Sequence, residues 1–250
     1  MKLASLLILL FAYPLYTYAN FKDGGDAYIN GDFETAAEIF EDLANRGDHR
    51  AIYALGSMYA AGQGVEKNLK KAHQLFTEAS QNGRTDAMYK LGLMYEYGSG
   101  IKKDTKKAIR LYRKSAQKGY PLSQYRFGLM YLNGIEVKQN PVNAYAWLVV
   151  AAHQFIYQYA ADEHTSTNNA IKSKKYLLLL IQKQEKEKLL NEIIKYLQDL
   201  RPAMSTSDIE KIYKKVKKFS KYRWKHVPIR FQNIQLTPDI ENLFLPETLQ

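Results

Sequence analysis

A sequence period of 36 residues runs through the middle of this 250-residue chain and constrains its fold more than any other feature. Glycine, tyrosine, methionine and alanine all recur at this step. A fixed period of this size is typical of a solenoid, in which each unit buries its apolar face only against its neighbours. We therefore expect an elongated array with an extended surface and no deep catalytic pocket. The glycines at this step are Gly47, Gly83 and Gly119, then Gly56, Gly92 and Gly128, and then Gly62, Gly98 and Gly134.

Each period predicts two helices. In one unit Leu55 and Met58 recur at helical spacing in a first run, and Leu75 and Phe76 do so in a second. Glycines also lie inside the first helices, where each costs about 1 kcal/mol relative to alanine. Their recurrence predicts that a partner helix passes too close for a side chain. These interior glycines are Gly56, Gly92 and Gly128.

Residues that favour helix ends stand between these runs. The side chain of asparagine or aspartate can accept a hydrogen bond from the free amides of a first helical turn. Glycine enters the left-handed conformation that closes a helix at little cost. The predicted N-caps of the second helices are Asn68, Asp104 and Asn140, and the predicted closing glycines are Gly47, Gly83 and Gly119.

The chain resembles the Sel1-like repeat proteins, relatives of the tetratricopeptide repeat with a longer loop between the two helices. The resemblance lies in the Leu-Gly-x-x-Tyr-x-x-Gly core that begins at Leu55, the Gly-x-Gly-Val loop that begins at Gly62, and a later Lys-Ala pair. Residues 51–83 and 87–119 match this pattern, whereas residues 123–152 lack the second glycine of the loop. The resemblance implies an all-α fold, a right-handed α-solenoid of helix pairs with extra C-terminal helices.

The first 19 residues have the layout of a secretory signal peptide. Lys2 gives a positive start, an apolar segment follows from Leu3 to Leu15, and small residues precede a cleavage site between Ala19 and Asn20. The segment is short for a membrane span, which needs roughly 20 apolar residues, although a retained N-terminal anchor is the alternative. We expect an exported protein, periplasmic or secreted, as in exported bacterial Sel1-like proteins.

The chain is expected to divide into five parts. Residues 20–50 resemble a plain tetratricopeptide unit, with a turn at Gly31 and Asp32 and an acidic composition suited to the outer face of a cap. The parts are a signal peptide at 1–19, an N-terminal capping unit at 20–50, Sel1-like repeats at 51–166, basic C-terminal helices at 167–225, and an irregular tail at 226–250.

Three long helices are predicted near the C-terminus. The first continues from Pro141 to about Ala161, and the second runs from about Asn169 to Leu200. The third is expected to begin at a capping box that starts at Ser207.

The basic C-terminal helices suggest an alternative function. The chain has a net charge of +11, and residues 171–225 hold 16 Lys and Arg against 6 Asp and Glu. A positive surface of this kind can bind a membrane surface or a cell-envelope polymer, although a solvated lysine face explains it as well. The residues of this alternative are Lys211, Lys214, Lys215, Lys218, Lys221, Arg223 and Lys225.

The sequence offers no convincing catalytic or metal site. The absence of cysteine excludes disulfides, thiolate nucleophiles and cysteine-based metal sites. Ser115 and Lys118 have the spacing of a serine–lysine pair, but Ser115 occupies the repeat position of Ala79 and is better explained as a small packed residue. Residues 162–164 (Asp-Glu-His) fit a solvated helix end better than a metal site. We therefore predict no catalytic residue, no metal and no cofactor.

The remaining candidate site is a surface of the first helices, opposite the buried Leu55 and Met58. If tetratricopeptide geometry holds, this face is concave. It mixes tyrosine and leucine with few charges, as peptide-binding surfaces do, although the tyrosines can also fill space between units. We predict an exported, non-enzymatic scaffold that binds a protein or peptide here, with no nucleic acid partner. The predicted partner-binding residues are Tyr53, Ser57, Tyr89, Leu93, Glu96, Tyr97, Tyr125, Leu129, Leu132 and Asn133.

Overall fold

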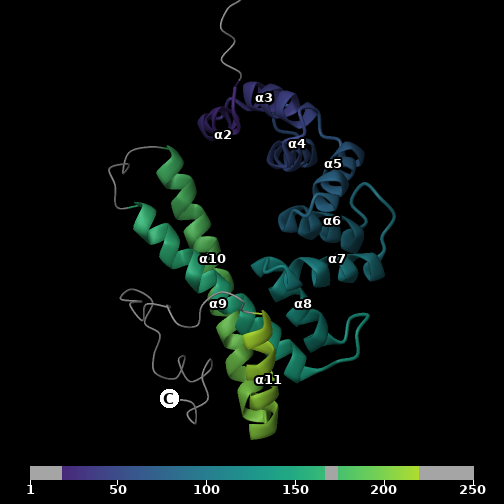
Figure 1. Ribbon diagram of the computed structural model, residues 1–250, viewed down its shortest axis with the longest axis vertical. Helices are drawn as coiled ribbons and strands as arrows, with labels where there is room; N and C mark the ends of the chain where they lie inside the picture. Colours follow the sequence, from purple (N-terminus) through teal and green to yellow (C-terminus); the bar gives the residue numbers. More distant parts are fainter. Residues whose placement is uncertain (1–18, 167–173, 220–250) are drawn as a thin grey trace, which may run out of the picture.

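The computed structural model describes residues 19–166 and 174–219, and its elements in these ranges are all helical (Figure 1). The predicted all-α fold is therefore confirmed. In chain order the elements are α2 (Phe21–Asn30), α3 (Phe33–Asn45), α4 (His49–Ala61), α5 (Leu69–Gln81), α6 (Thr85–Tyr97), α7 (Thr105–Gln117), α8 (Pro121–Asn133), α9 (Pro141–Ser166), α10 (Lys174–Leu200), the 3-10 turn η1 (Arg201–Ala203) and α11 (Thr206–Phe219).

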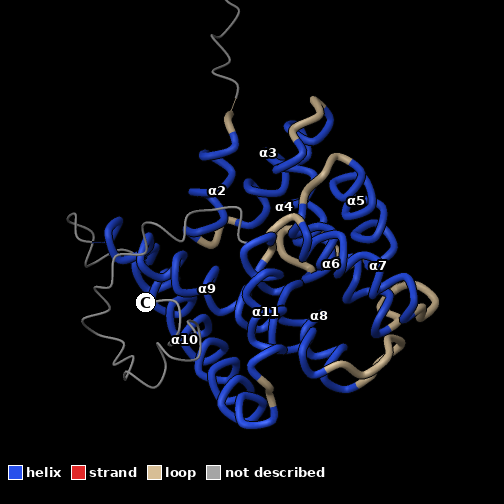
Figure 2. The backbone as a smooth tube through the Cα atoms, turned by 60° about the horizontal axis from the view of Figure 1, so that its bottom comes forward, coloured by secondary structure: helices blue, strands red, loops and turns tan. Residues whose placement is uncertain are grey.

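The first eight helices form four successive pairs. Each helix packs against its partner, and each second helix also packs against the first helix of the next pair. Figure 1 shows the stack curving from α2 to α8, and Figure 2 shows tight turns and longer loops alternating between the helices. The prediction of two helices in each 36-residue period is confirmed.

Hydrogen bonds confirm the predicted helix ends. The side chain of Asn68 accepts from the amide of Lys71 at 3.0 Å, and Asp104 and Asn140 each accept in the same way from the amide three residues ahead. The helix-closing glycines adopt positive φ, as expected for residues in the left-handed region. Their φ angles are +84° at Gly47, +87° at Gly83 and +95° at Gly119.

The third loop keeps the backbone conformation of the first two although it lacks their second glycine. Gly64 and Gly100 have φ of +68° and +73°, and Glu136 at the equivalent position has φ of +53°. A left-handed backbone costs a non-glycine residue about 1–2 kcal/mol. In the earlier loops packing also demands glycine, because an added Cβ would lie 2.0 Å from the carbonyl oxygen of Phe33 or 2.4 Å from the Cβ of Leu69.

The glycines inside the first helices mark close approaches between helices, as predicted. A Cβ added to Gly92 would lie 2.5 Å from the ring of Tyr112, and one added to Gly56 would lie 3.0 Å from the ring of Phe76. At Gly128 the nearest atom would be 3.1 Å away, on a leucine of α9. In each of these pairs an aromatic or leucine side chain of the second helix therefore packs against the backbone of the first helix at the glycine.

The C-terminal helices pack onto the last repeat. Both α10 and α11 pack against α9, which extends to Ser166, beyond the expected end at Ala161. The predicted start of the second long helix near Asn169 lies outside the described residues. Figure 1 shows that α10 runs from the side of α2, which it contacts, toward α11. The core that the three helices share includes Leu148, Phe155, Leu190, Ile193, Leu197, Ile212 and Val216.

The predicted capping box of the last helix is wrong by two residues. Helix α11 begins at Thr206, because Ser205 is its cap. The amide of Asp208 donates to Ser205 Oγ at 3.1 Å, and the amide of Ser205 donates to Asp208 Oδ2 at 3.2 Å. The sequence holds two overlapping boxes, one from Ser205 to Asp208 and one from Ser207 to Glu210. The first is used because η1 ends the preceding helix only two residues before it.

Candidate partner-binding face

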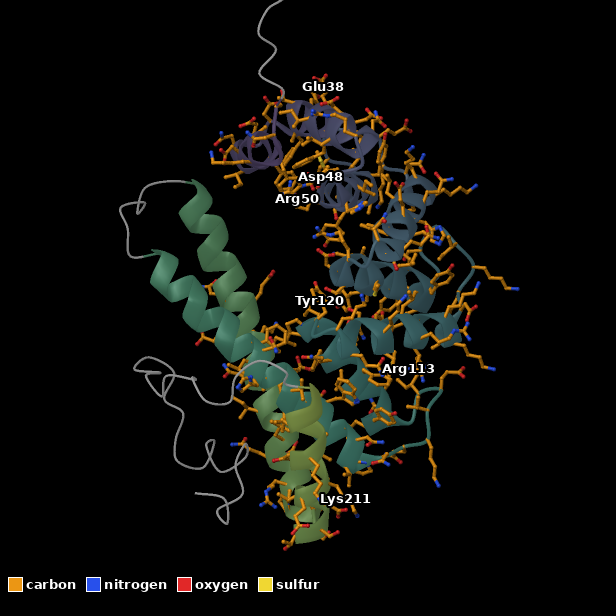
Figure 3. The ribbon with its side chains drawn as sticks, viewed as in Figure 1. Glu38, Asp48, Arg50, Arg113, Tyr120 and Lys211 are labelled. Atoms are coloured by element: carbon orange, nitrogen blue, oxygen red, sulfur yellow. The ribbon has the colours of Figure 1, made fainter. Side chains whose placement is uncertain are left out.

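Three successive first helices, α4, α6 and α8, present one face of the repeats, which we call the first-helix face. The ten residues predicted to bind a partner lie on these helices. Figure 3 shows Tyr120, in the turn before α8, at the inner edge of the curved array, and Arg113 of α7 on its outer side. The structure divides the ten residues among a packed tyrosine row, a polar network and an open groove.

The tyrosine row fills space between units. The rings of Tyr53 and Phe76 are 5.7 Å apart between centroids, and Tyr89 lies 5.8 Å from Tyr112 and 5.5 Å from Tyr120. Burial raises the pKa of Tyr53 and of Tyr89. These tyrosines contribute mainly to packing, the alternative that the sequence left open.

The third tyrosine of the row, Tyr125, lies under the C-terminal helix α10. It is 9% exposed, and its hydroxyl donates a hydrogen bond of 2.7 Å to Glu192 Oε1. Burial and this hydrogen bond raise the pKa of Tyr125. Leu129, one turn further along α8, packs against the same C-terminal core. The α8 part of the predicted surface is therefore largely covered by the chain itself.

A polar network joins α6 to α8. Arg126 Nη2 donates to the Tyr97 hydroxyl at 2.7 Å, and Arg126 Nη1 lies 3.4 Å from Glu96 Oε1. The other oxygen of Glu96 accepts a hydrogen bond of 2.6 Å from the Tyr112 hydroxyl, whose pKa is raised by burial and by this bond. The network therefore bridges α6 and α8.

Between α4 and α6 the first-helix face is open. A groove of about 340 Å³ lies there. Ser57 on α4 and Leu93 and Tyr97 on α6, three of the predicted residues, line it. Tyr97 is 61% exposed and Leu93 is half-buried. The remaining groove residues are Ala60, Ala61, Leu69, Phe76, Lys90, Met94 and Ser99.

The last two predicted residues lie at the end of α8, away from this groove. Leu132 is half-buried, and its carbonyl oxygen accepts a hydrogen bond of 2.8 Å from Gln139. Asn133 is exposed and precedes the left-handed Gly134. The structure thus brings together Ser57, Leu93 and Tyr97 of the ten, but does not form one continuous surface from all of them.

The groove contains residues that sequence reasoning did not select. Lys90 on α6 and Leu69 and Phe76 on α5 contribute to its walls. The aligned repeats contain a signal for this groove. Lys90 is equivalent to Arg126, and the residues of α4 that face Lys90 are unusually small. Comparing the sizes of equivalent residues across the three units would have located the gap.

Few of the residues of the anionic-surface alternative can be placed. Lys211 and Lys214 are exposed on α11, and Lys211 Nζ lies 3.4 Å from Asp208 Oδ1. The others belong to the part of α11 whose side chains are not described, or lie outside the described residues altogether. These others are Lys215, Lys218, Lys221, Arg223 and Lys225.

Ser115 is a packed residue, as its repeat position indicated. It is fully buried, donates to the carbonyl oxygen of Thr85 at 2.8 Å, and accepts from the Ser123 hydroxyl at 2.8 Å. The side chains of residues 162–164 lie outside the described set. Within the residues that were described, no group of three potential ligands is placed to hold a metal ion.

None of the helices that the structure describes combines the length and apolar composition needed to cross a bilayer.

Known proteins resemble this chain in sequence and in fold. The Sel1 repeat family matches residues 49–83, 85–120 and 121–154. A Sel1 repeat protein from Oxalobacter formigenes has a similar structure, with 22% identity and a TM-score of 0.54, over 78% of this chain and 89% of that one. No curated protein matches.

A second solved structure is c5321, a protective antigen present in uropathogenic Escherichia coli strains that displays an SLR fold. It is 22% identical, with a TM-score of 0.49, over 80% of this chain and 45% of that one, so this chain spans less than half of c5321. The three matched repeats coincide with the pairs α4–α5 and α6–α7 and with α8 and the start of α9. This chain therefore contains three Sel1 repeats, which span residues 49–154.

Proposed function

We propose that this protein is an exported, non-enzymatic scaffold that binds a segment of another protein on its first-helix face. Sel1 repeat proteins generally mediate protein–protein interaction as scaffolds, and this chain has their repeats. A stack of helix pairs presents an extended surface for such a partner. The non-enzymatic part of the proposal follows the typical role of the family.

The groove between α4 and α6 is the observation that carries this proposal. An exposed aromatic side chain, Tyr97, borders an open space with apolar walls. Aromatic residues in apolar depressions dominate the binding energy of many protein interfaces. At the equivalent position between α6 and α8, Arg126 bridges the two helices through Tyr97, whereas α4 has no residue that could make this bond with Lys90.

Affinity capture with a matched pair of variants tests the proposal. Immobilised residues 20–250 should retain a partner from the native source. The double variant Leu93→Ser with Tyr97→Ser should bind this partner at least about tenfold more weakly, which corresponds to about 1.4 kcal/mol. Arg113→Ser on the outer side of α7 serves as the control and should retain it. Equal capture by all three proteins would refute binding at the first-helix face, provided that circular dichroism shows equal helix content.

The proposed export rests on the sequence of residues 1–19 and is compatible with the start of the described fold. Asn20 caps α2: its side chain accepts from the amides of Lys22 and Asp23, and its own amide donates to Asp23 Oδ2 at 2.8 Å. Cleavage after Ala19 would leave this capping box intact. N-terminal sequencing of the protein from the cell envelope or the medium should begin at Asn20, and a sequence that begins at Met1 would contradict cleavage.

A further inference from the structure

The groove between α4 and α6 exists because the side chains on its α4 wall are small. At three equivalent columns α4 has Ser57, Ala60 and Ala61, whereas α6 has leucine, glutamate and tyrosine 36 residues later. Phe76 and Leu69 lie behind the small residues and give the groove an apolar floor. Its volume of about 340 Å³ is at the lower end of the roughly 300–1,000 Å³ of ligand pockets. It therefore suits one or two side chains of a peptide.

One cation borders the groove without an anionic partner. Lys90 lines it, and among the described residues no carboxylate forms an ion pair with Lys90. The nearby carboxylates of α6 are occupied, because Asp86 pairs with Arg84 and Glu96 with Arg126. The α4 wall offers only serine and alanine. The ammonium group of Lys90 can therefore pair with an anion that a ligand supplies.

In the next unit the cation equivalent to Lys90 has partners within the protein. Arg126, 36 residues after Lys90, forms hydrogen bonds to Tyr97 and Glu96 and so bridges α6 and α8. The residues equivalent to Tyr97 and Glu96 on α4 are Ala61 and Ala60, which can make neither bond. The cation at this repeat position is therefore bonded within the protein at the α6–α8 interface, whereas at the α4–α6 interface it lacks these partners.

We propose that this groove binds an extended acidic peptide segment of a partner protein. An apolar side chain of the segment would lie in the groove between the two helices, and a carboxylate within two residues of it would pair with Lys90. The net charge of these two units favours such a ligand at long range, because residues 51–118 hold 13 Lys and Arg against 5 Asp and Glu. The inference rests on the proposed function and assigns a chemistry to its ligand.

Peptide display on the immobilised mature protein tests this assignment. A random dodecapeptide library should become enriched in an apolar residue with Asp or Glu within two positions. Lys90→Glu should reverse the preferred charge to Lys or Arg, and Ala60→Leu should reduce binding of the enriched peptides at least tenfold. Lys71→Glu, the same charge change at an exposed position of α5, should alter neither. Circular dichroism confirms that the variants remain folded.

The outcomes separate this inference from the proposed function. Suppose that Lys90→Glu and Ala60→Leu leave the enriched peptides unchanged, whereas Leu93→Ser with Tyr97→Ser removes their binding. This result would overturn the acidic-peptide assignment but would still support binding at the first-helix face. A pool that no first-helix variant affects would overturn both. Two other occupants would also overturn the assignment. A second copy would show as a dimer in sedimentation that Ala60→Leu dissociates. The chain's own tail would show as amide protection within residues 236–250 that Ala60→Leu removes.

Discussion

Arg126 of α8 donates a hydrogen bond of 2.7 Å to the hydroxyl of Tyr97 on α6. The same guanidinium lies 3.4 Å from Glu96, so one side chain links two residues of the preceding unit. This bond distinguishes the two inter-helix spaces of the first-helix face, because Arg126 bridges α6 and α8, whereas no such side chain bridges α4 and α6 at the groove. The difference between the two spaces underlies both proposals about ligand binding.

The Arg126–Tyr97 bond predicts a measurable coupling. Hydrogen bonds that involve a charged group contribute about 1.5–3 kcal/mol, and partial exposure of this one should reduce the figure to about 1 kcal/mol. Arg126→Ala and Tyr97→Phe should therefore be less than additive in a double-mutant cycle measured by urea unfolding. Strict additivity would contradict the bond as described.

Two glycine substitutions should change stability in opposite directions. Gly92→Ala places a Cβ 2.5 Å from the ring of Tyr112, and such overpacking costs about 1–3 kcal/mol. Gly25→Ala is the matched control, because Gly25 lies in α2 with no atom within 4 Å of the added Cβ. There the higher helix propensity of alanine should stabilise by up to about 1 kcal/mol. Thermal unfolding compares the two, and a stabilised Gly92→Ala would refute the close packing of α6 on α7.

Asp48 should contribute stability that depends on pH. The side-chain hydrogen bond from Arg50 lowers the pKa of Asp48 from 3.8 to about 2, and the carboxylate also caps α4. Because the folded pKa is below the unfolded one, this stability is present above pH 3.8 and is lost as the pH falls towards 2. Asp48→Ala should cost about 1 kcal/mol at pH 7.

Urea unfolding at pH 7, 4 and 2.5 measures this dependence. The difference in the free energy of unfolding between the wild-type protein and Asp48→Ala should be nearly the same at pH 7 and pH 4 and clearly smaller at pH 2.5. Glu38→Ala, at an exposed site on α3 that Figure 3 marks on the outer surface, should change the free energy of unfolding by less than about 0.5 kcal/mol at pH 7. A difference for Asp48→Ala that is constant with pH would mean that its pKa is not lowered by folding.

The bond between Tyr125 and Glu192 should hold α10 against the last repeat. Tyr125→Phe removes the hydroxyl and its hydrogen bond to the exposed carboxylate of Glu192, so unfolding should become easier by about 1 kcal/mol. The substitution should accelerate hydrogen–deuterium exchange more in residues 184–200 than in α4, which lies in an earlier repeat. Uniform acceleration across both helices would indicate a general loss of stability instead.

Local signals in the sequence predicted much of the fold. The caps at Asn68 and Asp104 and the glycines at positions 56, 92 and 128 depend on neighbours within one unit, so a period and a few residue types were sufficient. Glu136 was different, because its left-handed backbone is not one that the residue type itself favours, so no local signal in the sequence predicted it. Ser205 was missed as a cap because two overlapping boxes compete and the end of η1 decides between them.

The candidate site was harder to predict, because it depends on contacts between units. Tyr125 and Leu129 share columns with accessible residues, but α10 covers them from far along the chain. The groove depends on what is missing from α4, namely large side chains at positions 60 and 61. No periodic pattern in a single helix reports such a gap; it follows from comparing equivalent residues of adjacent units.

Hydrogen–deuterium exchange on the complex with the captured partner tests the central claim most directly. The account predicts added protection in residues 49–61 and 85–97, which form α4 and α6, with little change in α10 and α11. Protection confined to residues 184–219 would contradict it and would assign binding to the C-terminal helices. In that case, loss of the complex as salt is raised would support the anionic-surface alternative.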